Sequence, residues 1–126
     1  MTTMISDDAA KAFSIPLPDE FVNYRELGGG NIPPWEFLDE EESLLLKKIV
    51  DSKYLDHKEC LPFAQSISSD DIALLTPRGL VRSLHLNASR GWESPEKDIP
   101  FTAWMHAACK ECVSYLQSLP KRLEPD

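Results

Sequence analysis

Hydrophobic residues in the first part of the chain recur at helical spacing within short segments. Residues 8–13 predict a short helix, and residues 20–27 predict a second one. The large hydrophobic side chains of the second segment share one face: Phe21, Tyr24 and Leu27. The glycine triplet at residues 28–30 predicts the end of this helix, because glycine adopts the left-handed conformation of a helix C-cap without strain.

A third helix is predicted from residue 39 to about residue 54. Asp39 and Glu42 have the three-residue spacing of a capping box, with Asp in the usual Ser/Thr position. The expected inward stripe of this helix is Leu45, Leu46, Ile49 and Val50. Pro33 and Pro34 precede it and favour an extended backbone. That extended segment is expected to bring three residues to the core: Trp35, Phe37 and Leu38.

The hydrophobic pattern of the middle of the chain is typical of strands. Residues 61–64 predict a short edge strand, because Pro62 cannot donate a ladder hydrogen bond. Two further strands are expected, at residues 72–75 and 80–86. The segment between them, residues 76–79, has Pro and Gly where a type I turn favours them.

A long final helix is predicted from Phe101 to about Leu119, between Pro100 and Pro120. Its hydrophobic positions form one continuous helical stripe. They are Phe101, Trp104, Met105, Ala108, Cys112, Leu116 and Leu119. Cys112 lies at the centre of this stripe.

Composition favours one globular domain. The chain has 126 residues, of which 42% are hydrophobic and 27% charged, so general disorder is not expected. The net charge of −8 disfavours general nucleic-acid binding, which needs a basic patch. Neither a signal peptide nor a membrane-spanning run is visible, and three widely spaced cysteines do not indicate a disulfide framework. We therefore expect a cytoplasmic protein that does not bind membranes.

The negative charge is concentrated in one part of the chain. Residues 1–75 hold 15 acidic and 6 basic residues, a net charge of −9, whereas residues 76–126 hold 6 acidic and 7 basic residues, a net charge of +1. The acids are densest at residues 36–42. This cluster is either a solvated helix start, where acids stabilise the positive end of the helix dipole, or a docking face for a basic partner.

Three cysteines and one histidine could form a zinc site. Cys109 and Cys112 form a CxxC, and His57 with Cys60 forms an HxxC, which together supply an acceptable structural ligand set. Against zinc, Cys112 lies at the centre of the stripe of the last helix, and buried free cysteine behaves as a small hydrophobic residue. We expect no bound metal and no other cofactor.

Other candidate residues do not form an active site. His85 and His106 have no Ser, Cys or carboxylate partner at a catalytic spacing, and we expect no enzyme activity. Trp92 follows Arg90 and Gly91 in a hydrophilic loop, and an exposed Trp beside an Arg is a plausible binding hot spot.

The order of these elements resembles the SUKH superfamily of bacterial immunity proteins and fungal cell-wall assembly regulators. The similarity begins with a leucine–proline pair, a helix and glycines, continues through a strand, a polar turn and a hairpin, and ends at a Phe-led helix. The matching segments are residues 17–30, 60–65, 70–75, 79–86 and 99–105. The resemblance spans about residues 15–118.

The resemblance implies an α+β fold, in which a twisted, mostly antiparallel sheet is flanked by helices. It implies one domain over residues 1–126, with an N-terminal lead at 1–14 and a loose tail at 120–126. It also implies a non-catalytic immunity protein that neutralises a cognate bacterial toxin, often a nuclease, by direct binding. Two other interpretations remain open: a general regulatory adaptor like the fungal members, and a zinc- or thiol-dependent protein using Cys60, Cys109 and Cys112.

For a toxin-binding protein, the acidic cluster becomes the expected docking face. Negative charge speeds association with a basic partner, and carboxylates can occupy a phosphate-binding groove. The expected contact residues are Glu36, Asp39, Glu40 and Glu41, with Trp35 or Trp92 as the aromatic anchor. In this arrangement Leu45 and Ile49 are expected to face inward.

Overall fold

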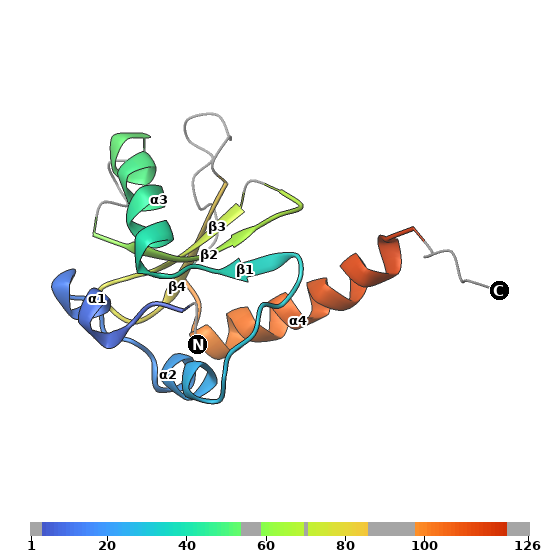
Figure 1. The fold of residues 1–126 in the computed structure, drawn as a ribbon, viewed down its shortest axis with the longest axis horizontal. Coiled ribbons are helices and arrows are strands. Elements are labelled where there is room, and N and C mark those ends of the chain that lie inside the picture. The colour runs from blue at the N-terminus through green and yellow to red at the C-terminus, as the bar shows by residue number, and fades with distance from the viewer. Residues whose placement is uncertain (1–3, 54–58, 70, 86–97, 121–126) are drawn as a thin grey trace.

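The computed structural model describes residues 4–53, 59–69, 71–85 and 98–120, with the side chains of Lys53 and His85 excepted. These residues form helices on both faces of an antiparallel sheet, so the predicted α+β class is confirmed (Figure 1). In chain order the elements are α1 (Asp7–Ala12), α2 (Asp19–Glu26), β1 (Trp35–Phe37), α3 (Glu40–Lys53), β2 (Leu61–Ser66), β3 (Asp71–Leu75), β4 (Val81–His85) and α4 (Phe101–Ser118).

The sheet has the strand order β1-β2-β3-β4, and every neighbouring pair is antiparallel. The prediction that residues 61–64 form an edge strand is wrong, because β2 lies between β1 and β3. Pro62 is tolerated there because the pairing shifts register between Pro62 and Ala64, and a bulge is a position where a missing N–H does not break the ladder. The predicted turn at residues 76–79 is confirmed: the Gly79 N–H donates to the Thr76 carbonyl, and Gly79 has a φ of +76°.

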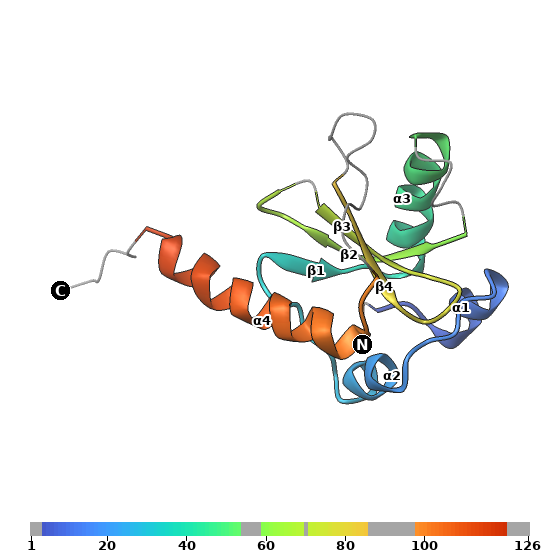
Figure 2. The same ribbon diagram turned by 180° about the vertical axis from the view of Figure 1, so that it is seen from behind.

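The main core lies between the sheet and the helices α2 and α4, which cover the same face (Figure 2). Its centre is a group of aromatic rings in mostly edge-to-face contact: Phe21, Phe37, Phe63, Phe101 and Trp104. The Phe63 ring centroid is 5.0 Å from that of Trp104 and 5.8 Å from that of Phe21. Phe63 therefore joins both helices to the sheet.

The opposite face of the sheet carries a smaller core under α3 (Figure 1). Val50 of α3 packs there with hydrophobic residues of the strands and with Cys60. Two polar residues of α3 also face the sheet: Ser43 Oγ donates to the Pro62 carbonyl, and Lys47 Nζ donates to the Cys60 carbonyl at 3.1 Å. These contacts decide which face of α3 is buried.

The predicted inward stripe of α3 is therefore wrong at two of its four positions. Leu45 is 58% exposed and Ile49 is 45% exposed, whereas Val50 is buried and Leu46 packs against the smaller core. The physical reason is that Ser43 and Lys47 face the sheet and bind carbonyl groups of the segment at residues 60–62. Leu45 and Ile49 lie two residues after them, about half a helical turn away, and so face solvent.

The N-terminal lead belongs to the main core. Ile5 is buried, and α1 is confirmed within one residue of its predicted bounds. The buried Arg25 of α2 donates to the Ile5 carbonyl and to Asp7 Oδ1, both at 2.9 Å. Arg25 takes the inward position at the end of α2, and Leu27 is 87% exposed although it was predicted to share a face with the buried Phe21.

Local signals at the helix ends are confirmed. The Glu42 N–H donates to Asp39 Oδ1 at 2.8 Å and the Asp39 N–H to Glu42 Oε1 at 3.1 Å, which is the reciprocal pattern of a capping box. Gly28 follows α2 with a φ of +96°, as the glycine triplet predicts. Trp35, Phe37 and Leu38 are buried as expected, although β1 itself was not predicted as a strand.

The first half of α4 packs on the sheet, but its second half extends beyond it (Figures 1 and 2). Phe101, Trp104 and Ala108 are buried, whereas Leu116 and Leu119 are exposed. The predicted stripe is thus correct only as far as the sheet reaches. Cys112 is half-buried at the edge of the main core and not at the centre of a buried stripe.

Truncating Phe63 should destabilise the whole domain. We expect Phe63→Ala to lower the free energy of unfolding by about 3–5 kcal/mol, because the cavity removes ring contacts to α2 and α4 together. Urea unfolding followed by tryptophan fluorescence measures this change. The matched control is Leu27→Ala, which removes an exposed side chain and should change stability by less than about 0.5 kcal/mol. Equal effects of the two substitutions would contradict this assignment of the core.

Candidate functional site

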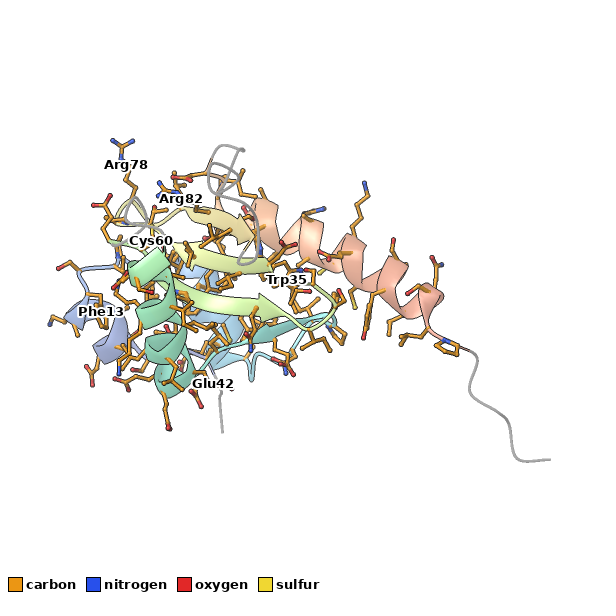
Figure 3. The ribbon with its side chains drawn as sticks, turned by 90° about the horizontal axis from the view of Figure 1, so that it is seen from above. Phe13, Trp35, Glu42, Cys60, Arg78 and Arg82 are labelled. Carbon is orange, nitrogen blue, oxygen red and sulfur yellow. The ribbon has the colours of Figure 1, made fainter. Side chains whose placement is uncertain are left out.

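The acidic cluster lies at the turn from β1 into α3. Glu40 and Glu41 are exposed in the first turn of α3, where they also stabilise the positive end of the helix dipole. Asp39 and Glu42 bind each other's backbone N–H groups, and Glu36 is half-buried on β1. Figure 3 shows Glu42 at the start of α3, away from Cys60 and Arg82. Of the four acids expected to contact a partner, Glu40 and Glu41 are the most accessible.

Hydrophobic side chains continue the acidic surface along α3. Glu41, Leu45 and Ile49 are four residues apart and so lie on one face of the helix. Lys48 and Ser52 are exposed on the same side. We call these five residues, together with the exposed Glu40 beside Glu41 in the first turn, the α3 face. Sequence reasoning missed the exposure of Leu45 and Ile49, although the polar residues Ser43 and Lys47 at inward helical spacing were a signal of the alternative orientation.

Trp35 cannot serve as an exposed aromatic anchor, so this prediction is wrong. Its side chain is buried, its ring packs against Trp104 at a centroid distance of 5.4 Å, and its indole N–H donates to Glu111 Oε1 at 2.8 Å. Trp35 instead ties β1 to the middle of α4. The other proposed anchor, Trp92, lies outside the described residues.

The cysteines do not come together in a metal site. Cys60 is buried on the α3 side of the sheet, whereas Cys112 packs against the main core on the opposite side and Cys109 is exposed on α4. Within the part of the chain that the structure describes, no three His, Cys, Asp or Glu side chains are grouped for a metal ion, and His57 lies outside it. Cys60 and the CxxC therefore cannot share one zinc ion.

Cys60 belongs to a polar cluster at the edge of the smaller core. Arg82 binds both oxygens of Asp98 at 2.8 Å and places Nη1 3.6 Å from Cys60 Sγ (Figure 3). Burial raises the pKa of the Cys60 thiol above its ordinary value, although the charge of Arg82 opposes this shift. The adjoining cavity, of about 500 Å³, is lined by Arg78 and Arg82 and by the carboxylates of Glu59 and Asp98. The protonated thiol is not an activated nucleophile, and the charges of the cavity balance.

Searches against protein-family models, curated proteins and solved structures found no match to this chain. The SUKH resemblance accordingly stays a prediction from sequence pattern. Among the described residues, no helix is both long enough and apolar enough to cross a membrane. Among the surfaces that the fold presents, the α3 face combines charged with hydrophobic side chains.

Titration of Cys60 should make stability depend on pH in the alkaline range. Because burial raises the pKa of this thiol in the folded protein, the unfolded chain releases its proton first as the pH rises past 9.0. The contribution of this thiol to the free energy of unfolding is therefore fully present below pH 9. It is lost as the pH rises from 9.0 through the pKa of the thiol in the folded protein. Between about pH 8 and pH 10.5, we expect the free energy of unfolding of the Cys60→Ala variant to fall less steeply with pH than that of the wild type. Urea unfolding at a series of pH values measures both slopes.

The matched control is Cys109→Ala, which removes an exposed thiol from α4 and should keep the wild-type slope. The comparison uses slopes against pH, because the cavity left by Cys60→Ala lowers stability at every pH. Identical slopes for wild type and Cys60→Ala would contradict the prediction.

Proposed function

We propose that this chain is a non-catalytic binding domain that neutralises a basic protein toxin by direct contact through the α3 face. The single observation that carries the proposal is the exposure of Leu45 and Ile49 directly after the acidic first turn of α3. Interfaces typically combine a small desolvated hydrophobic centre with a charged rim, and α3 offers both on one rigid element.

The charge of the chain suits a basic partner. Residues 1–75 carry a net charge of −9, and Glu40, Glu41 and Glu42 stand together at the start of α3. Long-range attraction of this kind raises the association rate and weakens as salt screens it. A nuclease toxin, whose active site must attract phosphates, is a partner of the required sign. The resemblance to immunity proteins points to the same class of partner.

The rigidity of α3 supports a role in recognition. Its start is fixed by the capping box, and its inward side is fixed by Ser43 and Lys47 on the segment at residues 60–62. Lys47 also lies with Nζ 5.4 Å from the ring centroid of Phe13, a cation–π contact that connects the helix to the end of α1. A surface that is ordered before binding loses little conformational entropy on association.

The proposal is tested with the purified product of the reading frame adjacent to the gene for this chain. We expect that product to arrest growth when expressed alone, and co-expression of this chain to restore growth. Titration calorimetry of the two purified proteins should show a one-to-one complex. A non-toxic neighbour, or a toxic neighbour that this chain does not bind, would contradict the proposal.

Reversing the acidic charge should slow association. We expect Glu40→Lys with Glu41→Lys to reduce the association rate constant about ten-fold at low salt and less at 0.5 M salt, because these exposed charges act mainly on the encounter. The dissociation rate should change little. Stopped-flow or surface-based kinetics at two salt concentrations measures both constants.

The matched control for charge is Asp8→Lys with Glu20→Lys. These exposed acids also lie in the first turns of helices, α1 and α2, and their reversal changes the net charge by the same amount. We expect a smaller change in association rate than for the α3 pair. If both pairs slow association equally, the overall charge of the protein attracts the partner, and the α3 face has no special role in the encounter.

Removing the hydrophobic centre should act on dissociation. We expect Leu45→Ala with Ile49→Ala to raise the dissociation rate constant at least ten-fold with little change in association, because desolvated anchors hold the complex together. Since both side chains are exposed, the stability of the free protein should change by less than about 1 kcal/mol. Leu27→Ala is the control, and unchanged dissociation in the α3 variant would exclude these residues from the interface.

A further inference from the structure

The last two turns of α4 and its C-cap residue, residues 112–119, expose hydrophobic side chains and carry no charge. Residues 112–119 contain no Asp, Glu, Lys or Arg, in a chain of which 27% is charged. Val113 is 57% exposed, Leu116 55% and Leu119 46%. Val113 and Leu116 are three residues apart on one side of α4, and Leu119, the C-cap residue three positions further on, extends this side, with Leu116 at its centre. Exposed hydrophobic residues gathered on one helix side mark an interaction surface.

We propose that a second copy of this chain covers this surface, with the two α4 helices packed antiparallel about a two-fold axis near Leu116. This arrangement sets Val113 of one copy opposite Leu119 of the other. The interaction is independent of the α3 face, because α3 and α4 lie on opposite faces of the sheet (Figures 1 and 2).

The distribution of charge favours a second copy as the occupant. A basic partner would be drawn to residues 1–75, with their net charge of −9, and not to residues 76–126, whose net charge is +1. Two acidic molecules repel each other least where they meet through uncharged helix. The same hydrophobic stripe on both copies also supplies the self-complementary patch that a two-fold interface requires.

The shape of the molecule sets the direction of packing. The sheet and the other helices lie at the beginning of α4, and its second half extends away from them (Figures 1 and 2). Parallel packing would bring the sheet and the helices α1 to α3 of both copies, which carry the excess negative charge, to the same end of the helix pair. Antiparallel packing separates them and brings the end of each α4 toward the sheet of the other copy.

The exposed Ile67 adds hydrophobic area at that end of the sheet. Its N–H donates to the Pro34 carbonyl at 2.8 Å, next to Trp35, whose indole binds Glu111 of α4. Ile67 thus lies near the point where the second half of α4 begins. The helix overlap alone is about 12 Å long, and stable interfaces bury about 800 Å² per partner, so we expect a weak dimer whose formation depends on protein concentration.

Sedimentation equilibrium of the full chain under reducing conditions tests the proposal between about 2 and 500 μM. We expect the wild-type mass to rise from 14.2 kDa toward twice that value as the concentration increases. Val113→Glu with Leu116→Glu should stay monomeric at every concentration. Far-ultraviolet circular dichroism confirms that this variant keeps its helices. Leu27→Glu, which places the same charge on another exposed leucine, should dimerise like wild type.

Disulfide trapping tests the direction of packing. In a chain carrying Cys109→Ser and Cys112→Ser, Leu116→Cys should form a covalent dimer on mild oxidation, whereas Val113→Cys should form at least ten-fold less. Efficient cross-linking at both positions indicates parallel packing and would overturn the antiparallel arrangement. A wild-type monomer at 500 μM, or a dimer that Val113→Glu with Leu116→Glu leaves intact, would overturn the proposed interface. Neither outcome affects binding through the α3 face.

Discussion

The orientation of α3 depends on two polar side chains that bind backbone carbonyl groups at the start of β2. Ser43 binds the Pro62 carbonyl and Lys47 binds the Cys60 carbonyl, and both side chains are buried. An unpaired buried ammonium or carbonyl would be costly, so the helix cannot turn about its axis without losing these bonds. The same constraint exposes Leu45 and Ile49. A requirement for satisfied polar groups therefore creates the surface on which the functional argument rests.

The bulge at Pro62 belongs to the same arrangement. Proline has no N–H to donate, and the shift in register between Pro62 and Ala64 lets β2 continue between two partners. The Pro62 carbonyl then accepts from Ser43 on the α3 side, while the neighbouring Phe63 packs into the aromatic core on the other side. Two neighbouring residues at the bulge thus contact the helices on both faces of the sheet: Pro62 contacts α3, and Phe63 contacts α2 and α4.

Signals that act within a few residues predicted the fold well. The capping box at Asp39, the glycine after α2 and the prolines flanking α4 placed the helix ends to within one residue or so. Predictions of which helix face is buried were less accurate. Hydrophobic spacing assigned Leu45 and Ile49 to the interior, but the orientation of α3 was decided by distant partners, the carbonyl groups of Cys60 and Pro62. In α2 a buried position is taken by Arg25, whose partners are Ile5 and Asp7. The burial of Trp35 was predicted, but its partners on α4, Trp104 and Glu111, are distant in sequence and were not.

Two surfaces with different physical character follow from this fold. The α3 face carries charge beside a hydrophobic centre, which suits a partner that is attracted over distance and then held by desolvation. The end of α4, at residues 112–119, lacks charge, so it gains nothing from long-range attraction and favours an equally apolar surface at high local concentration. Because the sheet separates the two surfaces, pairing through α4 leaves both α3 faces of a dimer open. Such a dimer would present two binding faces, and avidity would then favour partners that are themselves dimeric or densely packed.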